Sequence, residues 1–241
     1  MRAAVVIPNW NGSRWLTGCL DAVAAQTRPP DEVIVVDDAS EDDSVDVAHV
    51  HALAPTVIAL ERNGGFARAV NHGIRAATAD VVALVNVDVV LAEDWLERTI
   101  LALEADPRAA SVATKMVSME DPSILDDTGD WLRRDGGGEQ RGRYRRDQGL
   151  FDEPEEVWGA CAGAALYRRG AVLGVGGFEE RFVMYLEDAE LALRLRLAGW
   201  RCWYEPVLAR HHGASSSEHR SRTVLGWAAR NTVLIVAKYF P

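Results

Sequence analysis

The stretch "VVALVNVDVVL" (81–91) decides how this chain folds. Its first residues are apolar and mostly β-branched, which indicates a strand buried on both faces of a sheet. Two polar side chains, Asn86 and Asp88, interrupt the apolar pattern where that strand ends. Ligands of open α/β sheets bind beyond the carboxyl ends of the strands. We therefore expect Asn86 and Asp88 to face a ligand.

The segments around this stretch alternate between strand and helix. Apolar runs predict four strands, over residues 3–8, 31–38, 56–60 and 79–88. A helix is expected over 13–26, with Ser13 as its N-cap, and another over 92–107, which stops at Pro107. Short connections between such elements require right-handed crossovers. The first 107 residues therefore predict an α/β fold with a mostly parallel sheet and helices on both faces.

After residue 107 the alternation of apolar strands and amphipathic helices is weaker in the sequence. Residues 118–157 are rich in Gly, Asp, Glu and Arg, and we expect a long mobile loop or an irregular hairpin there. A helix is expected over 186–199, with Glu190 and Arg194 as a surface pair, and a strand over 200–206. The apolar tail, 223–241, predicts a helix that either packs on the core or contacts a membrane surface.

Composition excludes several classes of protein. The 241 residues carry a net charge of −10, which disfavours general binding to nucleic-acid phosphates. The three cysteines are far apart in the sequence, so we expect buried thiols and neither a disulfide framework nor a zinc site. The first strand begins almost at Met1, and no apolar run reaches the ~18 residues that a transmembrane helix needs. A cytoplasmic protein is the expectation.

Carboxylates end the second strand, at Asp37 and Asp38, and Ser40 follows in the same turn. A carboxylate there can accept a hydrogen bond from a pyrimidine base or a ribose hydroxyl, or it can cap the next helix. Both alternatives stay open from these residues alone. Gly64 and Gly65 permit close approach of the backbone to a phosphate or sugar, although a glycine pair is more often a simple turn.

Asp88 is a sharper candidate. It lies several residues before the helix that begins near Glu93, so a capping role suits it poorly. A carboxylate at a strand end suits a hard divalent cation, Mg²⁺ or Mn²⁺, which prefers oxygen ligands.

Other candidate residues lie in the second half. Asp188 follows Glu187 at the start of a helix, where acids either favour the helix dipole or act as a general base. Adjacent histidines, His211 and His212, do not easily face one point, so one ligand and one bystander are expected. The stretch "WGACAG" (158–163) combines an indole with small residues, which is typical of either a sugar-binding surface or a tightly packed strand.

Taken together, these motifs resemble those of the family 2 glycosyltransferases, which have the GT-A fold. The resemblance covers most of residues 4 to 217 and rests on stretches that occur in the family's order: "VVIPNWNG", "VIVVDDASEDDS", "RNGGFARAVNHGI", "VVALVNVDVVL", "GACAGAALYRRGAVLGVGGFEERF", "YLEDAELALRLRLAGWRCWYEP" and "HHGASSS".

The resemblance implies one GT-A domain over 1–241, with a nucleotide-binding half (1–107) and a smaller acceptor-binding half (108–241) that contains the mobile loop 118–157. It implies inverting transfer of a sugar from a nucleoside diphosphate to an acceptor hydroxyl, with Asp188 as the base. Asp88 and His211 or His212 would hold the metal. The implied donor-binding residues are Pro8, Asn9, Asn11, Asp38, Gly65, Arg68, Asn71, Asn86 and Val87, and the acceptor-binding residues are Trp158, Gly159, Ala160 and Glu187.

The chain departs from the family's DxD motif, because Asn86 replaces the first acid. Similar Asn-x-Asp versions occur in members that resemble rhamnosyltransferases, which favours a dTDP-linked 6-deoxysugar, with UDP-sugars as the other choice. The acceptor, whether glycan, glycolipid or small molecule, stays open, as does the pathway, polysaccharide biosynthesis included.

Three other functions were weighed. A nucleotidyltransferase or a dehydrogenase would need a glycine-rich phosphate loop after the first strand, and "PNWNGSRW" (8–15) has one glycine. The third alternative is a non-catalytic nucleotide-sugar binder or assembly partner with the same fold.

Overall fold

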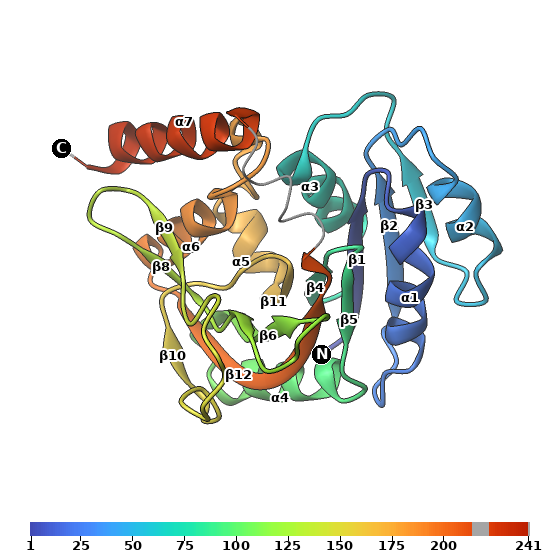
Figure 1. Cartoon of the computed structure of the whole chain (residues 1–241), viewed down its shortest axis with the longest axis horizontal. Coiled ribbons are helices and arrows are strands. Elements are labelled where there is room, and N and C mark those ends of the chain that lie inside the picture. The colour runs from blue at the N-terminus through green and yellow to red at the C-terminus, as the bar shows by residue number, and fades with distance from the viewer. Residues whose placement is uncertain (214–221, 241) are drawn as a thin grey trace.

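The computed structural model describes residues 1–213 and 222–240. These residues form twelve strands and seven α-helices, which alternate in the first half, whereas β6 to β11 follow one another without an α-helix (Figure 1). The strands are β1 (Ala3–Asn9), β2 (Glu32–Asp37), β3 (Thr56–Ala59), β4 (Val81–Val85), β5 (Val89–Leu91), β6 (Ala109–Ser118), β7 (Leu125–Asp127), β8 (Asp130–Leu132), β9 (Gly138–Gln140), β10 (Glu155–Val157), β11 (Ala164–Arg168) and β12 (Arg201–His211). The α-helices are α1 (Ser13–Ala24), α2 (Ser44–Val50), α3 (Phe66–Ala76), α4 (Trp95–Ala105), α5 (Arg169–Gly174), α6 (Glu187–Leu197) and α7 (Arg222–Tyr239).

A ten-stranded sheet forms the centre of the molecule, in the order β10-β12-β6-β11-β4-β1-β2-β3, with β5 and β7 attached at its side. The pairs β3–β2, β2–β1 and β1–β4 are parallel, as the sequence predicts. Beyond β4 the sheet becomes mixed, because β11 runs antiparallel to both β4 and β6. β8 and β9 form a separate two-stranded hairpin.

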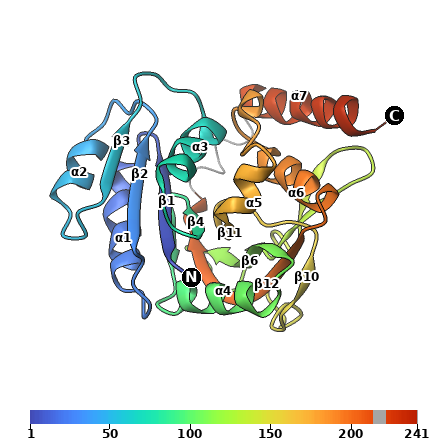
Figure 2. The same cartoon turned by 180° about the vertical axis from the view of Figure 1, so that it is seen from behind.

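Two apolar cores lie on the two faces of this sheet. One core packs residues of α1 and α4 against one face, and the other packs residues of α3, α5 and α6 against the opposite face. The view from behind shows α3, α5 and α6 on the face that Figure 1 hides (Figure 2). The predicted α/β architecture with helices on both faces is confirmed.

Several local predictions need correction. The N-cap of α1 is Gly12 and not Ser13, and no side-chain hydrogen bond caps this helix. The sequence analysis assigned no strand to β6, and β12 extends five residues beyond the strand expected over 200–206. Glu190 is fully buried, so its pair with Arg194 is not a surface pair.

The segment 118–157 is more ordered than the expected loop. It contains β7, β8, β9 and β10, and two basic side chains, Lys115 and Arg141, tie it to the sheet. Lys115 on β6 is buried and its Nζ lies 2.5 Å from carboxylate oxygens of Asp147 and Asp152. Arg141 pairs with Glu155 at 2.9 Å and lies over the ring of Tyr204. Interspersed acids therefore neutralise Lys115 and Arg141.

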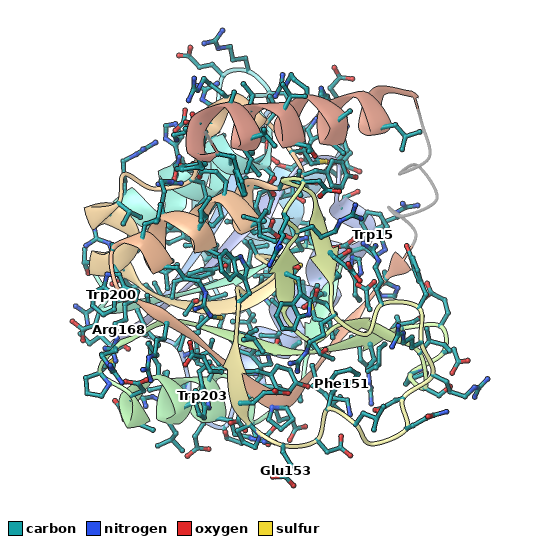
Figure 3. All side chains as sticks on the ribbon, turned by 90° about the vertical axis from the view of Figure 1, so that its left-hand side faces the viewer. Trp15, Phe151, Glu153, Arg168, Trp200 and Trp203 are labelled. Atoms are coloured by element: carbon teal, nitrogen blue, oxygen red, sulfur yellow. The ribbon has the colours of Figure 1, made fainter. Side chains whose placement is uncertain are left out.

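Helix α7 lies across the molecule on the side where the parallel strands end, above α6 and the β8–β9 hairpin (Figures 1 and 3). Ile235 and Asn231 on its inner side are buried, whereas Leu225 and Val233 are exposed. Within the described part of the chain, none of the helices is long and apolar enough to cross a membrane.

Gly73 sets how closely α3 approaches the sheet. A Cβ at this position would collide with Val6 of β1 and touch Val36 of β2. Gly73→Ala should therefore lower the free energy of unfolding by about 1–3 kcal/mol through overpacking. Gly18→Ala on α1 is the matched control, because nothing lies within 4 Å of a Cβ there. It should raise stability by about 0.5–1 kcal/mol through helix propensity. Urea unfolding of both variants measures this difference, and equal effects of the same sign would contradict it.

Candidate active site

The carboxyl ends of β1, β2 and β4 meet at one edge of the sheet and bring together polar side chains from three loops. Asn9 at the end of β1 is buried, and its amide nitrogen donates to Asp37 Oδ1 at 2.7 Å and to Ser40 Oγ at 3.2 Å. Ser40 also donates to Asp37 Oδ1 at 2.6 Å. Asp37 therefore joins the loops that follow β1 and β2 and does not cap α2, whose N-cap is Asp43.

Asn11 makes the second link between these loops. Its backbone N–H donates to Ser40 Oγ at 2.8 Å, and its side-chain oxygen accepts from the Glu41 N–H at 2.8 Å. The φ of Asn11 is 51°, a left-handed conformation that Asn tolerates better than most residues. Pro8 is buried at the end of β1. Pro8, Asn9 and Asn11 thus lie together at the end of β1, where the sequence predicts nucleotide binding.

Asp38 binds the glycine turn that precedes α3. Its carboxylate accepts hydrogen bonds from the Gly64 N–H at 2.9 and 3.1 Å and from the Gly65 N–H at 2.7 Å. Since a carboxylate has about four acceptor positions, about one remains for a ligand. Gly65 has a φ of 85°, and a Cβ there would lie 2.6 Å from the Val183 carbonyl oxygen. Only glycine suits this position.

Arg68 and Asn71 differ in how they relate to this edge. Arg68 is half-buried and lies against Gly64, at the nucleotide side of α3. Asn71 is buried, and its amide exchanges hydrogen bonds of 2.8 Å with the backbone N–H and carbonyl of Phe178. The amide of Asn71 thus links α3 to the segment before the 3-10 helix at Glu180–Phe182, and its expected contact with the donor stays a prediction.

The end of β4 carries the predicted cation site. The Asn86 N–H donates to the Gly163 carbonyl at 2.8 Å, while its buried side-chain oxygen has no hydrogen-bond partner. Val87 packs beside Gly12 at the start of α1. Asp88 is 6% exposed. An unsatisfied carbonyl oxygen and a buried carboxylate on one short turn are suited to a ligand that brings positive charge.

His211, at the end of β12, joins Asp88 to Asp126 of β7. Its Nε2 lies 3.2 Å from Asp88 Oδ2, and its Nδ1 lies 2.7 Å from Asp126 Oδ2. Burial opposes protonation of the ring, yet hydrogen bonds to Asp126 and Asp88 raise the pKa of His211 to about 10. The His212 N–H donates to the Asp88 carbonyl at 2.9 Å. The ring of His211 faces the candidate metal ligand Asp88.

These side chains fit a divalent cation. Metal–ligand bonds of about 2.1 Å at right angles place neighbouring ligand atoms about 3 Å apart, close to the separation of Asp88 Oδ2 and His211 Nε2. Asp126 on Nδ1 is the usual partner of a histidine that binds metal through Nε2. A cavity of about 300 Å³ adjoins His211 and is lined by Ser118, Glu120, Ile124, Leu125, Asp126, Tyr144 and Gly213.

The candidate base, Asp188, lies in the first turn of α6. Its Oδ1 accepts a hydrogen bond from the Ala189 N–H at 2.8 Å, and its Oδ2 accepts one from the Ala162 N–H at 3.4 Å. Burial raises the pKa of Asp188 above its ordinary value, and the hydrogen bond from Ala189 moderates that increase. A carboxylate that binds a proton more tightly than usual is a better general base.

Three more buried acids surround Asp188. Burial raises the pKa of Asp127 to about 7, and burial together with the charge of Asp127 raises the pKa of Asp130 well above its ordinary value. Glu187 is 6% exposed, and burial and Asp188 raise its pKa as well. Within residues 1–213 and 222–240, no basic side chain forms an ion pair with any of these four carboxyls. Proton uptake by this group of buried acids is therefore favoured.

The sequence analysis did not identify Asp126, Asp127 and Asp130. All three lie in the segment expected to be a mobile loop, "DDTGD" (126–130), whose spacing of acids around a Thr-Gly turn was the available signal. Asp130 and Asp188 also approach the Cys161 sulfur, with ligand atoms of all three within 4.8 Å. Burial keeps the pKa of the Cys161 thiol well above its ordinary value, so this group suits a cation less well than Asp88 and His211.

The small-residue stretch before β11 packs against α6. A Cβ on Gly159 would lie 2.7 Å from Ala192, and Ala160 is buried. One face of the Trp158 indole is covered by the guanidinium of Arg196, 4.8 Å from the ring centre. Of the two alternatives, tight packing therefore describes these residues better than an open sugar-binding surface.

Replacement of Asp130 by Asn tests whether a neutral carboxyl lies beside the base. An acid with a raised folded pKa stabilises the folded chain fully below its unfolded pKa of about 4, and loses that contribution as the pH rises. Asp130→Asn should therefore be more stable than the wild type at pH 8 by at least about 1 kcal/mol, the value of one pKa unit. The advantage should shrink towards pH 4.

Denaturant unfolding at pH 4, 6 and 8 measures this difference. Asp43→Asn, an exposed acid that makes no side-chain cap, is the control and should change stability by less than about 0.5 kcal/mol at each pH. A loss of stability in Asp130→Asn at pH 8 would mean that Asp130 is ionised and paired.

Known proteins resemble this chain in sequence. The model of the family described as glycosyl transferase family 2 matches residues 4–175. The pre-mycofactocin glycosyltransferase of Mycobacterium tuberculosis is 32% identical over 211 residues, which cover 82% of this chain and 39% of that protein. The N-acetylglucosaminyl-diphospho-decaprenol L-rhamnosyltransferase of the same species is 36% identical over 97 residues, which cover 39% of this chain and 31% of that protein. The chain thus spans less than half the length of these relatives.

Solved structures resemble it in fold. GalNAc-T7 with UDP, GalNAc and Mn²⁺ superposes with a TM-score of 0.76 at 15% identity, over 98% of this chain and 48% of that one. Residues 1–349 of S. aureus TarS in complex with UDP superpose with a TM-score of 0.69 at 19% identity, over 100% of this chain and 67% of that one. These are GT-A glycosyltransferases, so the expected GT-A fold is confirmed. With the family model matching most of its length, the chain belongs to glycosyl transferase family 2.

Proposed function

We propose that this chain is an inverting glycosyltransferase that moves a sugar from a nucleoside diphosphate to an acceptor hydroxyl in a single displacement. The observation that carries the proposal is the placement of Asp126 and Asp127 on β7. Asp126 bonds to His211 of the cation site, whereas the charge of Asp127 acts on the carboxyl group beside Asp188. The contacts of one short strand with both groups support a cation site and a base that act on the same transferred sugar.

The donor is a sugar nucleotide with a pyrimidine base. Pro8, Asn9 and Asn11 form the wall of the nucleotide site, Asp38 keeps about one acceptor position for the base, and Arg68 lies beside the glycine turn. UDP is bound in the TarS and GalNAc-T7 structures, which supports UDP- or dTDP-sugars. The rhamnosyltransferase relative, together with Asn86 in place of an acid, favours a dTDP-linked 6-deoxysugar.

Asp88 and His211 would hold Mg²⁺ or Mn²⁺, with Asn86 offering its unsatisfied oxygen. A cation bound there neutralises negative charge that develops on the departing diphosphate. Asp126 fixes the His211 ring so that Nε2 faces the site. The Mn²⁺ in the GalNAc-T7 structure supports this assignment.

Asp188 removes the proton of the acceptor hydroxyl as that oxygen attacks the anomeric carbon. Hydrogen bonds from Ala189 and Ala162 hold its carboxylate in place. The neighbouring acids favour proton uptake by Asp188, because a proton there relieves repulsion among buried carboxylates. The acceptor is a glycan, a glycolipid or a small molecule, and the exposed side of α7 offers Leu225 and Val233 for peripheral contact with a membrane on the cytoplasmic face.

Asp188→Asn tests the base. The amide cannot accept the proton, so transfer should fall by about 10²–10⁴-fold, the usual contribution of a general base. Affinity for the nucleoside diphosphate should stay within about threefold, because no donor contact is removed. Initial rates and calorimetric titration measure the two quantities. Asp46→Asn, an exposed acid in the first turn of α2, is the matched control. Transfer at the wild-type rate in Asp188→Asn would reject the base assignment.

Thermal unfolding with UDP, dTDP and GDP, each with Mn²⁺ or with chelator, tests the donor and the cation site. A ligand at 100 times its dissociation constant adds about 2.7 kcal/mol of stability. We expect stabilisation by a pyrimidine diphosphate that depends on Mn²⁺ in the wild type and is lost in Asp88→Ala. Equal stabilisation of both proteins in Mn²⁺ would show that Asp88 does not hold the cation, and stabilisation by GDP alone would reject the pyrimidine donor.

A further inference from the structure

The backbone that leads into Asp188 is held in an unfavourable conformation. Val183, Tyr185 and Leu186 have φ angles of 63°, 71° and 66°, and none of them is a glycine. L side chains other than Asn and Asp rarely adopt this left-handed region, and a run of such residues persists only when surrounding contacts fix it. Leu186 is the residue immediately before α6, so the conformation of this segment sets where Glu187 and Asp188 lie.

This left-handed segment, residues 183–186, also touches the nucleotide side. The Val183 carbonyl accepts a hydrogen bond of 3.4 Å from the Ala67 N–H at the start of α3. Gly65 lies so close to Val183 that no side chain fits between them. The segment therefore connects the glycine turn that Asp38 binds with the base at the start of α6.

Asn231 on α7 supplies the contacts that fix the segment. Its side chain is completely buried, and its amide nitrogen lies 3.0 Å from the Phe182 carbonyl oxygen, 3.0 Å from that of Met184 and 2.8 Å from that of Tyr185. These carbonyls belong to the left-handed segment and to Phe182, the last residue of a short 3-10 helix (Glu180–Phe182). A completely buried amide whose two N–H groups face backbone carbonyls costs much to remove, because buried acceptors then lose a donor.

The neighbouring residue, Arg230, fixes the orientation of that amide. Its guanidinium donates to Asn231 Oδ1 at 3.1 and 3.0 Å and also to the Arg181 and Phe182 carbonyls. A guanidinium is a donor only, so the Asn231 oxygen must face it and the nitrogen must face the segment.

The far end of α7 is tied to α6 as well. Glu190, two residues after the base, is fully buried, and it accepts hydrogen bonds from Tyr239 and from Lys238, the latter at 2.9 Å. Burial opposes ionisation of Glu190, but hydrogen bonds from Arg194 and Tyr239 hold its pKa below the ordinary value. Helix α7 thus contacts both the segment before the base and the helix that carries it.

We propose that Asn231 is a positioning residue for the base, which acts by holding the left-handed segment 183–186 in the one conformation that places Asp188 at the site. The effect of Asn231 on catalysis rests on the proposed function, whereas the contacts by which Asn231 fixes segment 183–186 do not depend on it. Helix α7 is then part of the active-site machinery, although none of the contacts described for it reaches the candidate donor site.

Hydrogen–deuterium exchange of the full chain tests directly whether Asn231 fixes segment 183–186. Loss of a buried hydrogen-bonding group should raise exchange of the amides in 182–190 about tenfold to a hundredfold in Asn231→Ala. Exchange in β1, β2 and β4 should not change. Val233→Ala, an exposed residue of the same helix, is the matched control and should exchange like the wild type. If Asn231→Ala does not fold, Arg230→Ala removes the group that orients the amide and should give a smaller increase at the same amides.

Steady-state kinetics then tests positioning. A misplaced base should lower kcat about tenfold or more while KM for the donor stays within about threefold, because the nucleotide wall is unchanged. A purely structural role for Asn231 would lower the amount of folded protein, but kcat calculated per folded molecule would stay at the wild-type value.

The outcomes separate the two proposals. Unchanged exchange at 182–190 in Asn231→Ala overturns the inference, and so does faster exchange with an unchanged kcat. Absence of transfer by the wild type rejects the proposed function, and the exchange comparison then decides alone whether Asn231 fixes the segment.

Discussion

The hydrogen bonds of His211 hold the two halves of this protein together at the site. Asp88 ends the nucleotide-side strand β4, Asp126 belongs to β7 in the segment after β6, and the His211 ring lies between their carboxylates. His211 reaches this position because β12 runs parallel to β6 along its whole length and pairs with β5 at its end. The cation site therefore depends on pairing between strands far apart in the sequence.

Alternation along a strand explains why the cation site and the base are neighbours. Consecutive side chains of a strand point to opposite faces, so Asp126 and Asp127 on β7 turn to different partners. Asp126 meets His211, and Asp127 joins the buried acids around Asp188. The proposed displacement breaks one bond of the anomeric carbon while forming another, so it needs both groups at fixed positions. The pairing of β7 with β6 anchors the strand that carries Asp126 and Asp127.

Much of the fold of residues 1–107 could be predicted from the sequence, because the strands and helices there follow a clear apolar pattern. The order of β1 to β4 and the polar residues at their ends follow from that pattern. Asp126, Asp127 and Asp130 could not be placed, since β7 and β8 are three residues long and owe their position to partners elsewhere in the chain.

The surroundings of individual side chains could not be predicted for the same reason. Asn71 bonds to Phe178, 107 residues away, and no local signal distinguishes that contact from one to a ligand. The pairing of Glu190 with Arg194 follows from helical spacing, but the burial of Glu190 depends on α7. Contacts between distant segments therefore limit what the sequence predicts about the site more than they limit the fold.

Violations of ordinary folding rules occur mainly in the segments that form the candidate site. Left-handed residues other than glycine occur at Asn11 and Ala39 in the nucleotide loops, at Tyr144 beside the cavity, and in the segment before Asp188; Ala54, in the turn before β3, is the exception. The uncompensated acids Asp127, Asp130 and Glu187 lie there too. Such features lower stability wherever they occur. Their retention at a site is therefore expected where selection acts on chemistry rather than on folding. Asn231 fits this interpretation because its hydrogen bonds offset the cost of the strained segment at the point where the base must be held still.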